Sequence, residues 1–192
     1  MSTETEAPSA IVTRIIDSAQ ELVQARGYNA FSFRDLAEIV GIRSASIHYY
    51  FPTKGDLAQA LVVRYRRSFG AHLSRIESNG GTARAQLDAY FDLIYRSFAS
   101  NNLICLCGML ATDAASLPPA ARDEVRGFFE DNESWLGRLL ERGNDEFRFG
   151  GEAQTVAASM FAGIQGAMIS AYTFGETARL RNALDWLATT LD

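Results

Sequence analysis

Apolar side chains recur at helical spacing along most of the chain. The first run places apolar residues three or four positions apart and stops at Gly27. Because glycine commonly ends a helix, this pattern predicts a first helix over about residues 11–27. The apolar positions that carry it are Ile11, Val12, Ile15, Ile16, Ala19, Leu22 and Val23.

A second, shorter helical pattern covers residues 33–40 and ends at a glycine. Leu36, Ala37 and Val40 give it an apolar face, and Ser32 stands where an N-cap residue is expected. Gly41 can adopt the left-handed backbone conformation that ends a helix and turns the chain sharply.

A third helix is predicted over residues 44–51, directly after this turn. Ser44 is its expected N-cap, Ile47 and Phe51 lie four residues apart on one face, and Pro52 stops it. Two short helices around a glycine turn form a helix-turn-helix, whose second helix fits the major groove of DNA. The sequence therefore favours a DNA-binding regulator.

The remaining periodicity is also helical. A helix from about Thr53 to Ile76 is longer than a small DNA-binding unit needs, so we expect it to bridge to the rest of the protein. The segment Ser78–Thr82 is the clearest linker. The later helices are expected through Leu87, Phe91, Ile94 and Phe98, then over about 103–115, 119–143, 152–174 and 177–191, with a loop at 144–151.

These elements predict an all-α fold, since no β-strand pattern is convincing. We expect a flexible tail over residues 1–9 and a three-helix helix-turn-helix domain over residues 10–56. Residues 57–192 are expected to form a helical bundle domain for ligand binding and dimerisation.

The charge distribution agrees with DNA contact at one end. The net charge is −5, yet residues 10–67 carry eight basic and five acidic side chains, so the front part is basic and the body acidic. The first nine residues do not resemble a signal peptide, and no apolar run is long enough to span a membrane. Two cysteines are too few for a disulfide framework. We therefore expect a cytoplasmic protein that makes no membrane contact.

The span of about residues 11–60 resembles the N-terminal domain of the tetracycline-repressor (TetR) family of transcriptional regulators. Order, spacing and residue types agree over nearly the full length of that domain. The matching residues are Ile15, Ala19, Leu22, Gly27-Tyr28, Phe31-Ser32-Phe33-Arg34-Asp35-Leu36-Ala37, Val40-Gly41-Ile42, Ile47-His48-Tyr49-Tyr50-Phe51-Pro52-Thr53-Lys54 and Leu57.

The resemblance implies a homodimer that binds double-stranded DNA at a pseudo-palindromic operator, with one recognition helix per half-site. It also implies a small-molecule effector in the C-terminal domain, whose last two helices pair with those of the partner. We expect a ligand-responsive repressor that the effector releases from DNA. An activator, an effector-independent DNA-binding protein and a small helical enzyme remain as alternatives. No catalytic set, cofactor motif or metal-ligand spacing supports the enzyme.

The candidate DNA-contacting residues come from the turn and the helices around it. Tyr49, Tyr50 and Lys54 are expected to contact phosphates, by chemistry and by the match to the family, although one tyrosine could pack in the domain core instead. Hydrogen-bonding side chains of the third helix, with Arg34 from the preceding helix, are expected at base edges. The full set is Arg34, Ser44, Ala45, Ser46, His48, Tyr49, Tyr50 and Lys54.

Polar and flexible residues on otherwise apolar helices suggest an effector pocket. The set is Cys105, Cys107, Met109, Asp113, Phe129, Asn132 and Gln165. Cys105 and Cys107 are two residues apart on a helix, so a bond between them is not expected. They fit either buried small apolar residues or a reactive thiol that senses electrophiles or oxidants.

Small residues at helical spacing in the 152–174 segment let helices approach closely, either within the chain or between two copies. The candidate dimer interface is Ala158, Ala162, Gly166, Leu184 and Leu187. The arginines at 64, 66 and 67 are expected to form a solvated basic face on the bridging helix.

Overall fold

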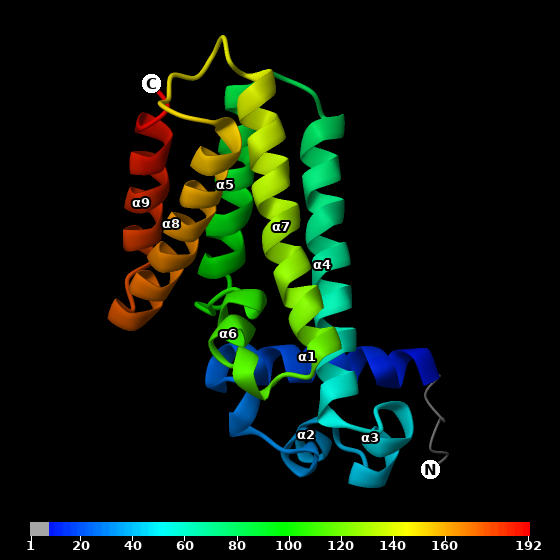
Figure 1. Cartoon of the computed structure of the whole chain (residues 1–192). Coiled ribbons are helices and arrows are strands. Elements are labelled where there is room, and N and C mark those ends of the chain that lie inside the picture. The colour runs from blue at the N-terminus through cyan, green and yellow to red at the C-terminus, as the bar shows by residue number, and fades with distance from the viewer. Residues whose placement is uncertain (1–7) are drawn as a thin grey trace.

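The computed structural model describes residues 8–192, and every regular element in that range is a helix (Figure 1). The all-α prediction is therefore confirmed for this part of the chain. The predicted tail lies outside it, except that Pro8 and Ser9 already belong to the first helix. The elements are α1 (Pro8–Arg26), η1 (Tyr28–Ala30), α2 (Phe33–Val40), α3 (Ser44–Tyr50), α4 (Lys54–Ser78), α5 (Ala83–Ala99), α6 (Leu106–Thr112), η2 (Ala114–Ser116), α7 (Pro119–Arg142), α8 (Ala153–Phe174) and α9 (Thr177–Thr189).

The helix-turn-helix forms where the sequence predicts it. The Ser32 side chain accepts a hydrogen bond from the backbone N–H of Asp35, whose carboxylate accepts from Ser32 in return, so α2 begins with a capping box. Gly41 ends α2 with φ 74°, in the left-handed region. Ile47 and Phe51 are buried, which fixes α3 against α2.

One cap differs from the prediction. Arg43, with no side-chain cap hydrogen bond, occupies the N-cap position of α3, and Ser44 is already the first helical residue. No side chain caps the first N–H groups of α3; the N–H of Ser46 donates to the Arg43 carbonyl at 2.8 Å instead.

The predicted bridging helix is α4, which continues without a break from the helix-turn-helix to the far end of the molecule (Figure 1). It begins with a second capping box, formed by Thr53 and Asp56. The predicted boundary between residues 56 and 57 lies inside this helix, so the two parts share one rigid element. The division into domains stays a prediction.

Arg66 attaches α4 to α7. Its guanidinium donates to both carboxylate oxygens of Asp131, at 2.5 and 3.0 Å, and to Glu124 at 3.1 Å. A Cβ atom at Gly127 would collide with this guanidinium, so glycine makes room for it on α7. The prediction of a solvated basic face is wrong for Arg66, which lies between two packed helices.

Aromatic rings fill the core of the body between α4, α5 and α7. The Tyr90 ring stacks on Trp135, with centroids 5.2 Å apart, and Phe69 packs edge-on against Phe128 at 5.3 Å. Asn132 is buried; it accepts from the Tyr90 hydroxyl at 3.1 Å and donates to the Phe128 carbonyl at 2.8 Å. The buried polar atoms of this amide are thus paired, which keeps the cost of burying it low.

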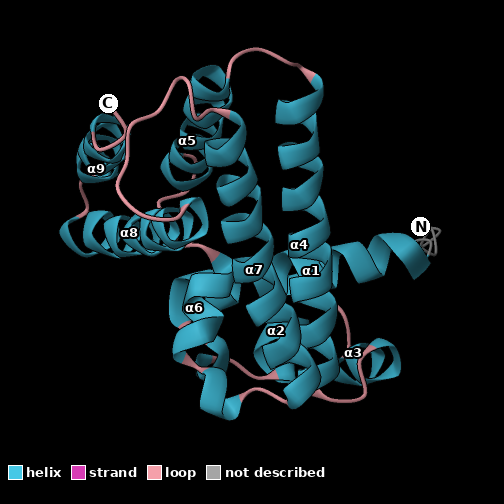
Figure 2. Ribbon diagram, turned by 45° about the horizontal axis from the view of Figure 1, so that its top comes forward, coloured by secondary structure: helices cyan, strands magenta, loops and turns pink. Residues whose placement is uncertain are grey.

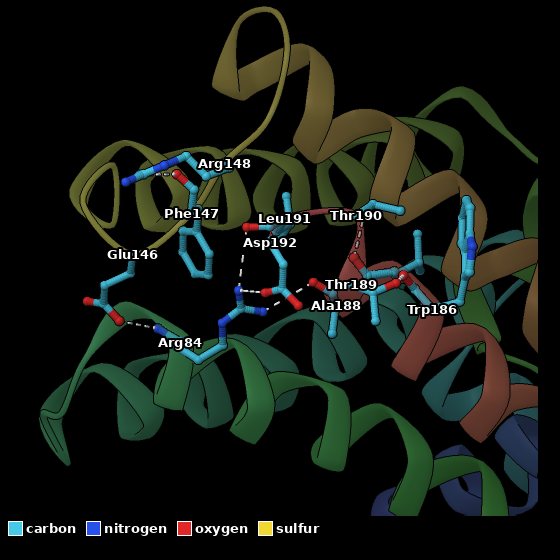
Figure 3. Close-up of polar contacts among 11 residues, drawn as sticks. Arg84, Glu146, Phe147, Arg148, Trp186, Ala188, Thr189, Thr190, Leu191 and Asp192 are labelled. Atoms are coloured by element: carbon cyan, nitrogen blue, oxygen red, sulfur yellow. Dashed lines mark hydrogen bonds and ion pairs between the residues drawn. The ribbon is translucent and has the colours of Figure 1, made fainter.

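The end of the body farthest from the helix-turn-helix closes around Arg84 of α5 (Figure 3). Its guanidinium donates to the carbonyl of Ala188 at 3.2 Å and contacts the carboxylate of Asp192 at 2.5 Å. Glu146 accepts from the backbone N–H of Ala83 and Arg84, at 2.9 and 3.0 Å. This cluster ties the start of α5 to the loop after α7 and to the end of α9.

The sixth helix is shorter than predicted. The sequence favours helix over 103–115, but the structure has α6 only from Leu106 to Thr112, followed by η2. Asn102 has φ 53°, and Cys105, the N-cap residue of α6, has the non-helical angles φ −47° and ψ 129°, so the helix begins only at residue 106. None of the helices in the described range is long and apolar enough to cross a bilayer.

Candidate nucleic-acid interface and effector site

α3 lies at the end of the molecule remote from α9 (Figure 2), and polar side chains of this helix are exposed. Ala45 and His48 are exposed, and Tyr49 is 81% exposed. Ser44, Ser46 and Tyr50 are half-buried, with Tyr50 packed on the domain core. The alternative that one tyrosine packs inward thus applies to Tyr50, whereas the Tyr49 hydroxyl is free to reach a phosphate.

Two of the candidate base-contacting residues have partners within the domain. Arg34 of α2 is exposed and forms an ion pair with Glu38 at 3.4 Å. The His48 ring lies edge-on to Phe33, with centroids 4.8 Å apart, and its Nδ1 is 3.3 Å from the carbonyl oxygen of Pro52. Both side chains remain exposed in spite of these contacts.

Lys54, by contrast, is turned toward the protein. Its ammonium donates to the backbone carbonyls of Tyr28 and Phe31 and lies 4.7 and 4.0 Å from the centroids of their rings. Burial lowers the pKa of Lys54, and the nearby carboxylate of Asp113 acts in the opposite direction. Lys54 therefore stabilises the end of η1. The sequence predicts a phosphate contact for this residue and gives no sign of this structural role.

A groove of about 870 Å³ runs between α4 and α5 and reaches α1. Its apolar wall comes from Tyr65, Phe69, Ile76 and Leu93, and Asp17 and Gln20 of α1 close its lower end. None of the seven predicted effector-pocket residues lines it. The sequence feature that could have indicated this groove is the row of charged residues next to an apolar stripe on both α4 and α5. This feature is not specific, because an ordinary solvent-facing helix has the same pattern.

Comparisons with known proteins agree with this geometry. The family model described as bacterial regulatory proteins, tetR family, matches residues 15–61. The crystal structure of a TetR-family transcriptional regulator from Agrobacterium tumefaciens is 33% identical, covers 96% of this chain and 99% of its own, and superposes with a TM-score of 0.92. The chain belongs to the TetR family of transcriptional regulators.

Two further relatives support this assignment. A TetR transcriptional regulator from Legionella pneumophila is 30% identical, with 99% of this chain and 100% of that chain covered and a TM-score of 0.85. The probable HTH-type transcriptional regulator YttP of Bacillus subtilis is 32% identical over 84 residues. That match spans 42% of this chain and only 41% of YttP. This TetR-family chain is thus a DNA-binding regulator, as its helix-turn-helix predicts, and its relatives are not enzymes.

Asp113 has a structural role in this TetR-family protein, different from the ligand contact expected of it. Its carboxylate accepts from the backbone N–H of Tyr28 at 2.8 Å and from the side chain of Asn29 at 3.1 Å. Gln24 of α1 adds a second connection, because it is buried and donates to the Ile104 carbonyl at 2.7 Å. Both contacts join the helix-turn-helix domain to α6 and the segment before it.

Both cysteines are buried. Burial raises the pKa of the Cys105 thiol and raises that of Cys107 well above its ordinary value. Tyr65 donates to the Cys105 sulfur at 3.7 Å. This environment favours neutral thiols, and it supports the interpretation of these cysteines as buried small apolar residues.

The other pocket candidates lie in or near the interior between α6, α7 and α8. Met109, Phe129 and Gln165 are half-buried. The Oε1 atom of Gln165 is buried without a hydrogen-bond partner in the described part of the chain. Between residues 8 and 192 no cluster of His, Cys, Asp or Glu side chains could hold a metal ion.

The dimer-interface candidates divide into two groups. Ala162 and Gly166 are exposed on α8 and Ala158 is half-buried. Leu184 and Leu187 are buried inside the chain, so their burial does not support the predicted place of these two leucines in a dimer interface. The periodicity of α9 contained this information, because Leu180, Leu184 and Leu187 share one buried face of the helix. Trp186, 64% exposed, lies on the other face.

Proposed function

We propose that the protein is a cytoplasmic, ligand-responsive repressor, which binds a pseudo-palindromic operator as a homodimer. The observation that carries the proposal is the exposed face of α3. Tyr49 is 81% exposed on a short helix that Ile47 holds firmly in the domain core. A rigid helix with a free polar face is the arrangement that enters a major groove.

The exposed face of α8 supports the homodimer. Along this helix Thr155, Ser159, Ala162, Gly166 and Ile169 are all exposed and follow each other at three- or four-residue intervals. Such a stripe of small and apolar side chains permits close packing with a second copy of the helix. Two-fold symmetry of the pair then requires two-fold symmetry of the operator.

The groove between α4 and α5 is the proposed effector site. It extends to α1, where Arg64 of α4 forms an ion pair with Asp17 at 2.7 Å. A ligand here contacts the bridging helix and the DNA-binding domain at once. Since the dimer must match a fixed half-site spacing, a shift of α1 relative to α4 lowers operator affinity.

Fluorescence anisotropy with a duplex selected from random DNA tests operator binding. We expect Tyr49→Ala to weaken binding about tenfold while thermal unfolding is unchanged. Arg43→Gln and Arg138→Gln form a matched pair, since both arginines are exposed, one beside α3 and one on α7.

Only Arg43→Gln is expected to reduce the salt dependence of binding, by about one unit of the slope of log K against log salt. Equal effects of the two arginine variants would contradict recognition through α3. Specific DNA binding that responds to no compound in a metabolite screen would instead indicate the effector-independent alternative.

A further inference from the structure

The groove between α4 and α5 has a chemical character that its shape alone does not reveal. Aromatic and aliphatic side chains form one wall, and the acidic and basic side chains in its lining are Asp17, Arg64, His72, Arg75, Asp92 and Arg96. Three arginines and two aspartates thus line the groove beside its apolar wall. The lining is suited to a ligand with an apolar body and a negative charge.

The carboxylates of the lining are already engaged. Asp17 pairs with Arg64 at 2.7 Å. Asp92 accepts from both Nη atoms of Arg181 on α9, each at 3.2 Å, and lies 3.5 Å from Arg96. Within the described part of the chain no carboxylate pairs with Arg75, so the lining keeps an excess of positive charge.

Two of the arginines lie at the same level of the groove. α4 and α5 run in opposite directions on either side of the Asn79–Thr82 turn (Figure 1). Arg64 is fourteen residues before the end of α4 and Arg96 thirteen residues after the start of α5. At about 1.5 Å per residue, both are about 20 Å from the turn. Arg64 and Arg96 therefore flank the lower end of the groove, next to α1.

We propose that this groove binds a free organic acid, with its carboxylate between Arg64 and Arg96 and its apolar body along Phe69 and Leu93. The inference rests on the proposed function and names the ligand class of the effector site. The acid competes with Asp17 for the Arg64 guanidinium. Binding consequently removes the ion pair between α1 and α4 and loosens the DNA-binding domain from the body.

Isothermal titration calorimetry of the full chain with octanoate tests the site, and octanamide is the neutral probe of the same length. We expect saturable octanoate binding and at least tenfold weaker octanamide binding, because the amide lacks the charge-assisted contact. Arg64→Gln is expected to weaken octanoate binding about tenfold and Arg96→Gln about two- to fivefold, because Arg96 is exposed at the rim.

Arg67→Gln is the matched control, since Arg67 is exposed on the same helix but does not line the groove. Equal binding of octanoate and octanamide, equal losses in Arg67→Gln and Arg96→Gln, or no saturable octanoate binding would each overturn the inference. Arg96→Gln keeps the Arg64–Asp17 ion pair, so it remains informative if Arg64→Gln loosens the fold.

Operator affinity gives an independent readout. Octanoate is expected to lower the operator affinity of the wild-type protein about fivefold or more and to have a smaller effect on Arg96→Gln. Operator binding without ligand tests the proposed function by itself, so specific DNA binding with no octanoate binding would refute only the ligand class. Octanoate binding that leaves operator affinity unchanged would refute the competition for Arg64.

Discussion

Lys54→Met is expected to weaken operator binding by unfolding the DNA-binding domain rather than by removing a phosphate contact. The ammonium donates to the Tyr28 and Phe31 carbonyls, which lose these donors in the variant. A hydrogen bond to a charged group contributes about 1.5–3 kcal/mol, and an unpaired carbonyl costs a similar amount. Methionine retains the packing of the aliphatic stem, so the net loss of stability is about 2–4 kcal/mol.

Thermal and urea denaturation at fixed protein concentration measure this loss. A change of 1 kcal/mol lowers the melting temperature of a chain of this size by about 2–4 °C. Lys54 is also the only lysine in the sequence, so amine-specific labelling reports on it alone beside the N-terminal amine. We expect slow labelling of Lys54 in the folded state and fast labelling in urea.

Tyr49→Ala is the matched comparison, because that side chain is 81% exposed. It is expected to change stability by less than about 0.5 kcal/mol. If Lys54→Met keeps wild-type stability, labels rapidly when folded and still loses DNA affinity, then Lys54 contacts phosphate and the reasoning from its two carbonyl partners is wrong.

Three further predictions concern the body of the protein. A Cβ atom at position 166 meets no atom of its own chain, but an arginine there obstructs the proposed dimer interface, so Gly166→Arg is expected to give folded monomers in sedimentation experiments. Gly70→Arg on α4 is equally unobstructed and is expected to leave the dimer intact. Cys105 and Cys107 are expected to react with a thiol reagent only after unfolding, and rapid reaction of the native protein would revive the thiol-sensor alternative. Two backbone N–H groups at the start of α5 lower the pKa of Glu146 below its ordinary value of 4.5. The ionised carboxylate therefore stabilises the fold above pH 4.5, and this contribution is lost as the pH falls through the pKa that Glu146 has in the folded state. Glu146→Gln should therefore show a smaller loss of stability on acidification, and an unchanged pH dependence would rule out this contribution.

The helix-turn-helix was predictable because short-range patterns define it. Ser32, Gly41 and the Ile47–Phe51 spacing each act within a few residues, and the structure has α2 and α3 where those signals place them. The same reasoning could not reveal the role of Asp113. Its partners are 84 and 85 residues away, a pairing that no local pattern encodes.

Which faces of the helices are exposed and which are buried also depends on contacts between distant residues. The small residues of α8 correctly indicated close approach, yet Gly166 faces outward while Leu187 packs against Gly163 within the chain. Whether a small residue of α8 packs against α9 or against a second copy of the chain depends on the position of α9. The effector groove was not predictable either, because it depends on how far α4 and α5 diverge.

The hydrogen bonds of Arg66 fix one point of α4 against α7, and the rest of the helix can tilt about this point. Three hydrogen bonds to Asp131 and Glu124 hold the helix to α7 at this point. Lys54 begins the helix twelve residues away, about 18 Å at helical rise. A tilt of about 10° around Arg66 therefore moves the start of α4 by about 3 Å, in the direction opposite to its far end. In the proposed dimer the displacements of the two protomers add to about 6 Å, so the distance between the recognition helices would change by nearly two base-pair steps of about 3.4 Å.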